Sequence, residues 1–422
     1  METYAQILLY ASPIFFVFVF GEKIYGKFVK GDDFKSMDMI SSLSSGFTNT
    51  LKDILGFGIS IITYSWMVDH WALFHIPFTW VNVLIAFIML DLAGYWGHRL
   101  NHQINFFWNQ HLVHHSSEEF NLACALRQSI SDIIKFFTIF MLPAALLGVD
   151  AKIIAIVAPI HLFAQFWYHT TYIGKMGWLE KIIVTPSHHR VHHAINPEYI
   201  DKNHGQIFII WDKLFGTFQE ELPDVKPIYG ITRPVRTWNP IKINYQHLWL
   251  LIKDAYHAQS WKDKLRIWWM PTGWRPADVA ERFPVYKIDD PYNFEKYKPN
   301  ASHALEVWSW VQFGVTFTFL MILFKAVPEV SYFDLLLYGI FLFLNVYSYT
   351  ELMDLNPNAF WQELLKNAFG LALLIKNGGW FWLKDQSSML NFLVVVYFFA
   401  ATVVTAYFVF GELRMKKLSF LS

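Results

Sequence analysis

Nine apolar stretches of roughly membrane-spanning length run along this chain, and they constrain its fold more than any other feature. They lie near residues 4–20, 54–74, 80–96, 133–148, 151–168, 304–325, 333–350, 361–383 and 389–410. A helix needs about 20 predominantly apolar residues to cross the hydrocarbon core of a bilayer. The 422 residues are 54% hydrophobic and only 16% charged, which is too apolar for a soluble protein of this length. The sequence therefore predicts an all-α, polytopic integral membrane protein.

Polar and turn-rich segments divide the chain into three parts. We expect an N-terminal transmembrane region at 1–96, a histidine-rich region with a polar cap at 97–303, and a C-terminal transmembrane region at 304–422. The two apolar stretches within 133–168 are barely separated, so they predict a membrane hairpin. Turn-forming prolines between Pro271 and Pro299 mark the boundary before the last spans.

Basic residues near the N-terminus predict the orientation. No Lys or Arg precedes Lys23, whereas the loop after the first apolar stretch carries Lys23, Lys27, Lys30 and Lys35. Because basic loops are retained in the cytoplasm, this loop should be cytoplasmic, and later segments then alternate. Every histidine-rich segment then falls at the cytoplasmic face. We expect a multi-pass protein of the endoplasmic reticulum in a eukaryote, or of the inner membrane in a bacterium.

Histidines are concentrated in the middle of the chain, where 12 of the 17 fall between His98 and His204. Most have helical spacing: His98 and His102; His111, His114 and His115; His169; and His188, His189, His192 and His193. Residues three or four apart project from one face of a helix, and neutral imidazole is the commonest protein ligand for transition metals. One catalytic zinc takes about three protein ligands and a structural zinc about four. The number of histidines therefore predicts a two-metal site.

The ligand type narrows the chemistry. Two-metal hydrolases commonly hold their ions with bridging carboxylates, so a centre of imidazoles argues against them, although imidazole alone suits iron, zinc and copper. A site beside the bilayer can reach a carbon a short way down a lipid chain, and O₂-dependent attack on a C–H bond requires a redox metal. We therefore expect two iron ions acting on a lipid from the bilayer with O₂ and a reductant. Purification can itself load zinc into such a site, so zinc in purified material does not exclude iron.

Other function classes also fit a histidine-rich membrane protein. A haem-binding cytochrome with paired histidines is one alternative, but these histidines are too numerous and lie beyond the span ends. A zinc-dependent membrane hydrolase or metal transporter is another. Nucleic acid is not an expected partner, because the net charge is zero and the basic residues are dispersed. The single cysteine, Cys124, excludes an intrachain disulfide and a thiolate metal cluster.

Several sequence strings resemble the fatty acid hydroxylase and sterol desaturase superfamily of membrane di-iron oxygenases. Its histidine boxes match HRLNH at 98–102, HLVHH at 111–115 and HRVHH at 189–193, with QFWYH at 165–169 between them. The strings HHSSEEFNL at 114–122, ALRQS at 125–129, TPSHHRVHH at 185–193, YIDKN at 199–203 and IWDKLFGTF at 210–218 are similar to the ether-lipid-cleaving branch, the alkylglycerol monooxygenases. The resemblance covers roughly residues 50–245 and continues faintly through the C-terminal spans.

The resemblance implies a ligand set and an activity. The family's metal ligands fall on His98, His102, His111, His114, His115, His169, His189, His192 and His193, with His188 a further candidate. It implies an O₂-dependent oxidoreductase that hydroxylates the carbon next to the ether oxygen of alkylglycerols, giving glycerol and a fatty aldehyde, with electrons from tetrahydrobiopterin. A sterol or fatty acyl hydroxylase or desaturase is the alternative, because the first boxes are common to the whole superfamily.

The chain departs from the family pattern at two positions. Gln103 stands where a family member has an acidic residue connected with the pterin, so Gln103 is the candidate cofactor-binding residue. This difference leaves open whether the reductant is the pterin, another small molecule or a protein. His204 stands where relatives tend to show Tyr, and it is a candidate for an additional or outer ligand, as is His161.

Polar residues near the boxes are candidates for outer contacts. Metal-bound histidines usually donate their far N–H group to a carboxylate or carbonyl, and Asp201, Asn203, Glu118 and Gln165 are the residues we expect there. Helix capping or solvent pairing is the alternative role for them. Arg127 and Arg190 are interpreted either as contacts to a lipid phosphate or as snorkelling interfacial residues.

Overall fold

A computed structural model describes residues 2–32, 34–74, 76 and 79–413, and it is helical, without extended strands in these ranges. The N-terminal and central helices are α1 (Glu2–Tyr25), α2 (Ser36–Ile54), α3 (Tyr64–Trp71), α4 (Trp80–Gln103), α5 (Asn105–His115), α6 (Leu122–Ala125), α7 (Leu142–Leu146), α8 (Ala151–Phe163), α9 (Pro186–His192) and α10 (Ile210–Phe215). The remaining helices are α11 (Pro240–His257), α12 (Trp261–Arg266), α13 (Ala277–Arg282), α14 (His303–Ala326), α15 (Tyr332–Met353), α16 (Ala359–Asn377) and α17 (Ser388–Ala406).

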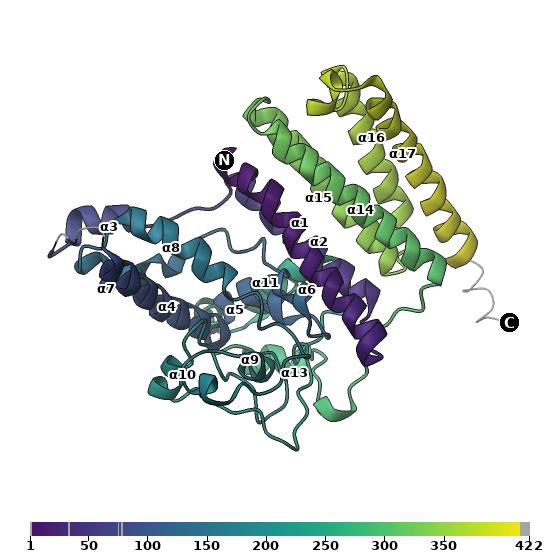
Figure 1. The fold of residues 1–422 in the computed structure, drawn as a ribbon. Coiled ribbons are helices and arrows are strands. Elements are labelled where there is room, and N and C mark those ends of the chain that lie inside the picture. The colour runs from purple at the N-terminus through teal and green to yellow at the C-terminus, as the bar shows by residue number, and fades with distance from the viewer. Residues whose placement is uncertain (1, 33, 75, 77–78, 414–422) are drawn as a thin grey trace.

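Five helices of the described residues are long and apolar enough to cross a membrane, and the protein is a multi-pass membrane protein. They are Tyr4–Lys30, Trp80–Gln103, His303–Ala326, Tyr332–Met353 and Ser388–Leu413. Figure 1 shows α14 to α17 side by side as one bundle with α1 next to it. The histidine-rich region, with α4, α5 and α9, forms the other part of the molecule.

Four of the nine expected spans are not among these five helices. The stretch 54–74 contains only the short helix α3, because Gly56 adopts a positive φ of 70° and Ile59 forms a β-bridge with Ile134. The stretches at 133–148 and 151–168 contain the short apolar helices Phe136–Leu146 and Ala151–Phe163. Helix α16 is not among the candidate spans, because it carries three charged residues, Glu363, Lys366 and Lys376.

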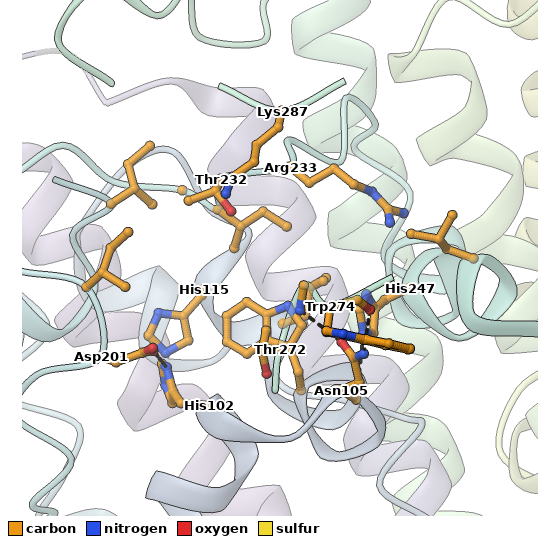
Figure 2. Close-up of a pocket in the computed structure, with 18 of the residues that line it drawn as sticks. His102, Asn105, His115, Asp201, Thr232, Arg233, His247, Thr272, Trp274 and Lys287 are labelled. Atoms are coloured by element: carbon orange, nitrogen blue, oxygen red, sulfur yellow. Dashed lines mark hydrogen bonds and ion pairs between the residues drawn. The ribbon is translucent and has the colours of Figure 1, made fainter. Parts of the chain in front are cut away.

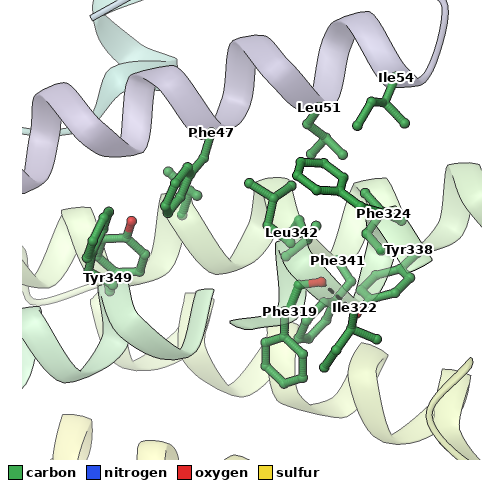
Figure 3. Packing of buried hydrophobic residues seen from close by; sticks show 14 of the residues in the cluster. Phe47, Leu51, Ile54, Phe319, Ile322, Phe324, Tyr338, Phe341, Leu342 and Tyr349 are labelled. Atoms are coloured by element: carbon green, nitrogen blue, oxygen red, sulfur yellow. Dashed lines mark hydrogen bonds between the residues drawn. The ribbon is translucent and has the colours of Figure 1, made fainter. Parts of the chain in front are cut away.

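Helix α2 joins the C-terminal bundle to the histidine-rich region. Its aromatic and aliphatic face packs against α14 and α15, and Figure 3 shows Leu51 and Ile54 on the side of Phe324, and Phe47 farther along α2 on the side of Tyr349. Its other face is rich in buried serines. Gly46 permits close approach there, because a Cβ at this position would lie 2.8 Å from the carbonyl oxygen of Leu126. The loop after α6 is thereby held against α2.

A buried polar network connects helices α14 to α17. Lys366 donates to Glu363 at 2.6 Å, and the same carboxylate accepts from Ser348 of α15 at 2.6 Å. Asn367 donates to the carbonyl oxygen of Phe398 on α17 at 3.0 Å. Buried polar groups need hydrogen-bond partners, so this network fixes how the helices of the bundle pack against one another.

Candidate metal centre

The histidines come from four segments that converge beside the end of α4. His98 and His102 lie in the last turns of α4, and the chain turns at Ile104, which is extended, before α5 begins. This turn brings the α5 histidines opposite those of α4. His169 follows α8, and α9 supplies the third box, with Pro186 at its first turn and a capping box between Thr185 and His188.

Nine histidines form two adjoining groups whose ring nitrogens lie close enough to hold metal ions. One group is His98, His102, His111, His115 and His192, and the other is His114, His169, His189 and His193. Within each group the ligand atoms lie within 4.8 Å of one another. The rings of His115 and His193 stack across the boundary, with centroids 4.2 Å apart. These are the nine positions that the family resemblance implies.

Adjacent histidines in the sequence point into different groups. His114 belongs to one group and His115 to the other, and the same holds for His193 and His192. Consecutive helical residues project about 100° apart, so an HH pair at a helix end can serve two neighbouring ions. The doubled histidines in the second and third boxes therefore join the two groups.

Backbone carbonyls orient the imidazoles. The Nδ1 atoms of His98, His192 and His169 lie 2.8, 2.9 and 3.1 Å from the carbonyl oxygens of His204, Lys202 and Gln165. Because a carbonyl only accepts, these Nδ1 atoms carry the proton, which leaves the Nε2 lone pair free to bind a metal.

In the described structure, the Nε2 atoms of the nine histidines make no hydrogen bond to any residue outside the two groups. Those of His98 and His111 face each other at 2.8 Å, and those of His189 and His169 at 2.9 Å. The Nε2 atoms of His102 and His192 are buried without a hydrogen-bond partner. Buried nitrogens of this kind carry a desolvation cost unless something binds them, and a metal ion fits this donor set.

Burial keeps the imidazoles neutral. It lowers the pKa of His114 to about 3, and it holds the pKa of His169 and His193 well below the usual range. Neighbouring imidazoles lower these pKa values further, since two adjacent rings resist carrying charge together. The neutral form is the one that coordinates metals, so these side chains are ready to bind at neutral pH.

The four expected outer residues have different contacts. Asp201 places Oδ1 3.4 Å from Nδ1 of His102, and Gln165 contributes its backbone carbonyl to His169. Asn203 instead donates to the carbonyl of His188 at 3.1 Å and lies in the left-handed region with φ of 55°. Glu118 accepts from the backbone N–H of Tyr297 at 2.6 Å. The last two therefore stabilise loops and make no described hydrogen bond to the nine histidines.

The additional candidates lie outside both groups. His188 takes part in the cap of α9, and His161 pairs with Asp91 at 2.7 Å. His204 is buried beside His102, but its Nε2 faces the carbonyl of Asp201 at 3.1 Å. Gln103 accepts the N–H of Thr272 through its carbonyl at 3.1 Å, and its side chain does not line the cavity at the site.

Two buried carboxylates that sequence reasoning missed shape the loop behind the centre. Asp91 accepts from His161, from the backbone N–H groups of Ile207 and Phe208, and from Trp211 Nε1. Asp212 accepts from the N–H groups of His204 and Gly205. They hold the loop whose carbonyls orient His98 and His192. Asp91 is a carboxylate within an apolar span, and this unusual position is the sequence signal that could have identified it.

Arg127 and Arg190 neither face a lipid phosphate nor extend toward the membrane interface, the two roles expected from the sequence, because both pair with groups inside the protein. Arg127 is buried, where it donates to Ser116 at 2.9 Å and Ser42 at 3.1 Å and lies 3.6 Å from Asp38. Its own carbonyl lies 3.3 Å from Nδ1 of His114. Arg190 forms two hydrogen bonds with Glu221, at 2.9 and 2.6 Å. Both residues are structural, because their charges are satisfied within the protein.

We predict that Arg127→Met destabilises the fold, because it leaves the Asp38 carboxylate buried without its cation. Removing one partner of a buried pair costs about 3–5 kcal/mol, whereas replacing both partners is often nearly neutral. The double variant Asp38→Asn, Arg127→Met should therefore recover part of the loss. Thermal unfolding in detergent, followed by tryptophan fluorescence, measures both. A single variant as stable as the wild type would contradict this role.

A cavity of about 270 Å³ adjoins the five-histidine group. His102, His115 and Asp201 lie at one end of it, and Asn105, His247 and Trp274 lie at the other, as Figure 2 shows. Thr232, Arg233 and Lys287 form the opposite wall, and the rest of the lining is mainly apolar, including Trp108, Leu112 and Leu250. The cavity can therefore hold a molecule with both polar and apolar parts next to the metal groups.

A helical multi-pass membrane protein with two adjoining groups of neutral imidazoles beside a cavity has the architecture of a membrane metalloenzyme. Residues 83–217 match the fatty acid hydroxylase family. The alkylglycerol monooxygenase of Homo sapiens is 33% identical over 84% of this chain and 80% of its own length. Those of Xenopus tropicalis and Danio rerio are each 32% identical over 84% of this chain and 79% of their own lengths. No solved structure matches the chain.

The chain therefore belongs to the alkylglycerol monooxygenase family, and it is an oxidoreductase of the monooxygenase class.

Proposed function

We propose that this protein is a di-iron monooxygenase that hydroxylates the carbon next to the ether oxygen of alkylglycerols. The observation that carries the proposal is the pair of histidine groups beside a mixed polar and apolar cavity, in a chain that matches alkylglycerol monooxygenases over most of its length. We propose residues 97–303 as the catalytic region, with its site at the cytoplasmic face of the endoplasmic reticulum or of a bacterial inner membrane.

The two groups are the proposed iron ligands. His98, His102, His111, His115 and His192 would hold one ion, and His114, His169, His189 and His193 the other. Bound iron would supply the activation of O₂ that an unactivated C–H bond requires. The residues of the chain keep the imidazoles neutral and oriented through the carbonyls of Lys202, His204 and Gln165. Zinc binds the same donors, so elemental analysis of the purified protein identifies the metal.

The cavity is the proposed place for the reacting part of the lipid. Leu112, Ile195 and Ile231 offer an apolar surface for the carbons next to the ether oxygen, and Thr232 offers a hydrogen bond to a glycerol hydroxyl. Hydroxylation of that carbon makes a hemiacetal, which breaks the bond to the ether oxygen and releases glycerol and a fatty aldehyde. The protein needs only to perform the C–H step, because the hemiacetal decomposes in water.

Tetrahydrobiopterin is the proposed reductant, by similarity to the family. Gln103 is the residue proposed to contact it, although the position is acidic in a family member and the Gln103 side chain does not line the described cavity. Comparison of Gln103→Glu with the wild-type protein tests the assignment. A lower KM for the reduced pterin in the variant supports it, and an unchanged KM removes this residue from the site.

The decisive experiment offers three lipids to the purified protein. An alkylglycerol, a sterol and a fatty acyl lipid are each incubated with O₂, with and without a reduced pterin, and fatty aldehyde is measured. We expect aldehyde from the alkylglycerol alone, and two irons per chain without a Soret band. Clean hydroxylation or desaturation of the sterol or acyl lipid would indicate the other branch of the superfamily. A Soret band would indicate haem, and zinc without oxygen uptake would indicate a hydrolase or transporter.

A further inference from the structure

Helix α11 presents apolar and aromatic side chains on two opposite faces. His247, Leu250 and Leu251 point inward and line the cavity beside the five-histidine group. On the other face Tyr245, Trp249, Ile252 and Tyr256 follow one another at helical spacing and are exposed. Trp249 retains 58% and Tyr256 78% of its accessible surface. A contiguous exposed aromatic face of this length is unfavourable in water, and such faces mark contacts with a membrane or another molecule.

The exposed face continues into α12 and adjoins a candidate membrane span. Trp261 and Leu265 of α12 are 77% and 69% exposed. At the other end, Ile241 and Tyr245 line an apolar cavity together with Phe343 and Leu344 of α15. Because α15 is long and apolar enough to cross the membrane, α11 begins beside lipid-embedded structure.

The charges near this face fit a lipid surface. Between residues 241 and 270 the sequence has five basic residues and two acidic ones. Both acidic residues, Asp254 and Asp263, are paired with arginines. Lys253 and Lys262 are exposed beside the aromatic side chains. Trp and Tyr with neighbouring Lys are typical of segments that lie in the bilayer interface, where anionic headgroups attract the lysines.

We propose that α11 and α12 lie in the headgroup region of the bilayer and form a membrane-immersed wall of the metal-centre cavity. Lipid, and not a second protein, then covers the exposed face of α11 and α12. One helix then separates the bilayer from the cavity, and we further propose that the lipid substrate enters along α11. The immersion stands on the geometry alone, whereas the entry route rests on the proposed function.

Spin labels test the immersion without any need for turnover. Cys124 is the single cysteine and is 1% exposed, so Trp249→Cys, Ile252→Cys and Tyr256→Cys each carry a label at the chosen site only. The matched control is Asp224→Cys, an exposed position in the polar cap. In nanodiscs of mixed neutral and anionic lipid, collisions with O₂ and with a water-soluble nickel chelate are measured by electron paramagnetic resonance.

We expect labels at 249, 252 and 256 to favour O₂ over the nickel chelate, and the label at 224 to do the reverse. High nickel access on α11 would overturn the proposal, because the face would then be in water. Low access to both would also overturn it, since the face would then be covered by protein. Three labels on one face keep the test valid if one variant does not fold.

Kinetics test the entry route separately. Ile252→Asp places a charge on the lipid side of α11 without touching the cavity lining. We expect KM for alkylglycerol in nanodiscs to rise several-fold with kcat and metal content unchanged. An unchanged KM, together with O₂-accessible labels, would overturn the entry route and leave the immersion intact. Absence of turnover in the wild-type protein would contradict the proposed function, and the spin-label result would still stand.

Discussion

Replacing His114, His169 or His192 by Ala should each abolish activity and release metal. Loss of an outer residue that only orients a ligand typically costs 10–100-fold in metal affinity or activity, so loss of a ligand should cost more than about 100-fold. The three residues come from different segments, and between them they belong to both groups. Metal content by mass spectrometry and fatty aldehyde production are the two measurements.

His188 is the matched control for this experiment. It lies in the same short helix as His189 and is also buried, but it is outside both groups and contributes to the cap of α9. His188→Ala should lower stability by about 0.5–2 kcal/mol, the usual cost of losing a cap, and retain metal. Substitutions of His70 and His257, which lie far from the boxes in sequence, should also retain metal. His75 is a further control of this kind, and it lies outside the described residues. Full activity in any of the three box variants would remove that residue from the ligand set.

Oxygen from O₂ should appear in the aldehyde product. Each turnover should consume one O₂ and one two-electron reductant: one oxygen atom enters the substrate C–H bond as a hydroxyl, and the other leaves as water. When the hemiacetal collapses, the bond to the ether oxygen breaks, so the new hydroxyl oxygen becomes the aldehyde oxygen and the ether oxygen leaves with glycerol. Turnover under ¹⁸O₂, with rapid trapping to limit exchange, measures this by mass spectrometry.

Removal of O₂ is the control for this prediction, and it should stop aldehyde formation completely. A hydrolase would behave differently, because water would cleave the ether to glycerol and a fatty alcohol without O₂ and without any aldehyde. Aldehyde that forms without O₂, or that carries no label despite trapping, would contradict the monooxygenase reaction on ether lipids. Hydroxylation of a sterol with no action on alkylglycerols would contradict only the substrate, because the histidine centre would still be that of an oxygenase.

The helical character, the membrane location and the histidine boxes could all be predicted from the sequence. These features depend on local periodicity: an apolar run needs only its own length to cross a bilayer, and HxxHH places its histidines by the 3.6-residue turn of the helix. The number of spans was overestimated for the same reason. Local hydropathy does not distinguish the lipid-facing α17 from the shorter apolar helix α8 or the interrupted stretch after Ile54.

The partition of the nine histidines into five and four was decided by the tertiary structure alone. It depends on contacts between segments far apart in the chain, such as His98 with the carbonyl of His204 and His114 with that of Arg127. Backbone carbonyls have no sequence signature, which is why side chains such as Asn203 and Glu118 were expected in their place. The buried pairs of Arg127 and Arg190 were hidden for a similar reason, since a charged residue is satisfied by whichever partner the fold brings to it. Spacing along each helix thus placed the histidines of a box on a shared face, and long-range packing determined how the nine histidines are grouped and oriented.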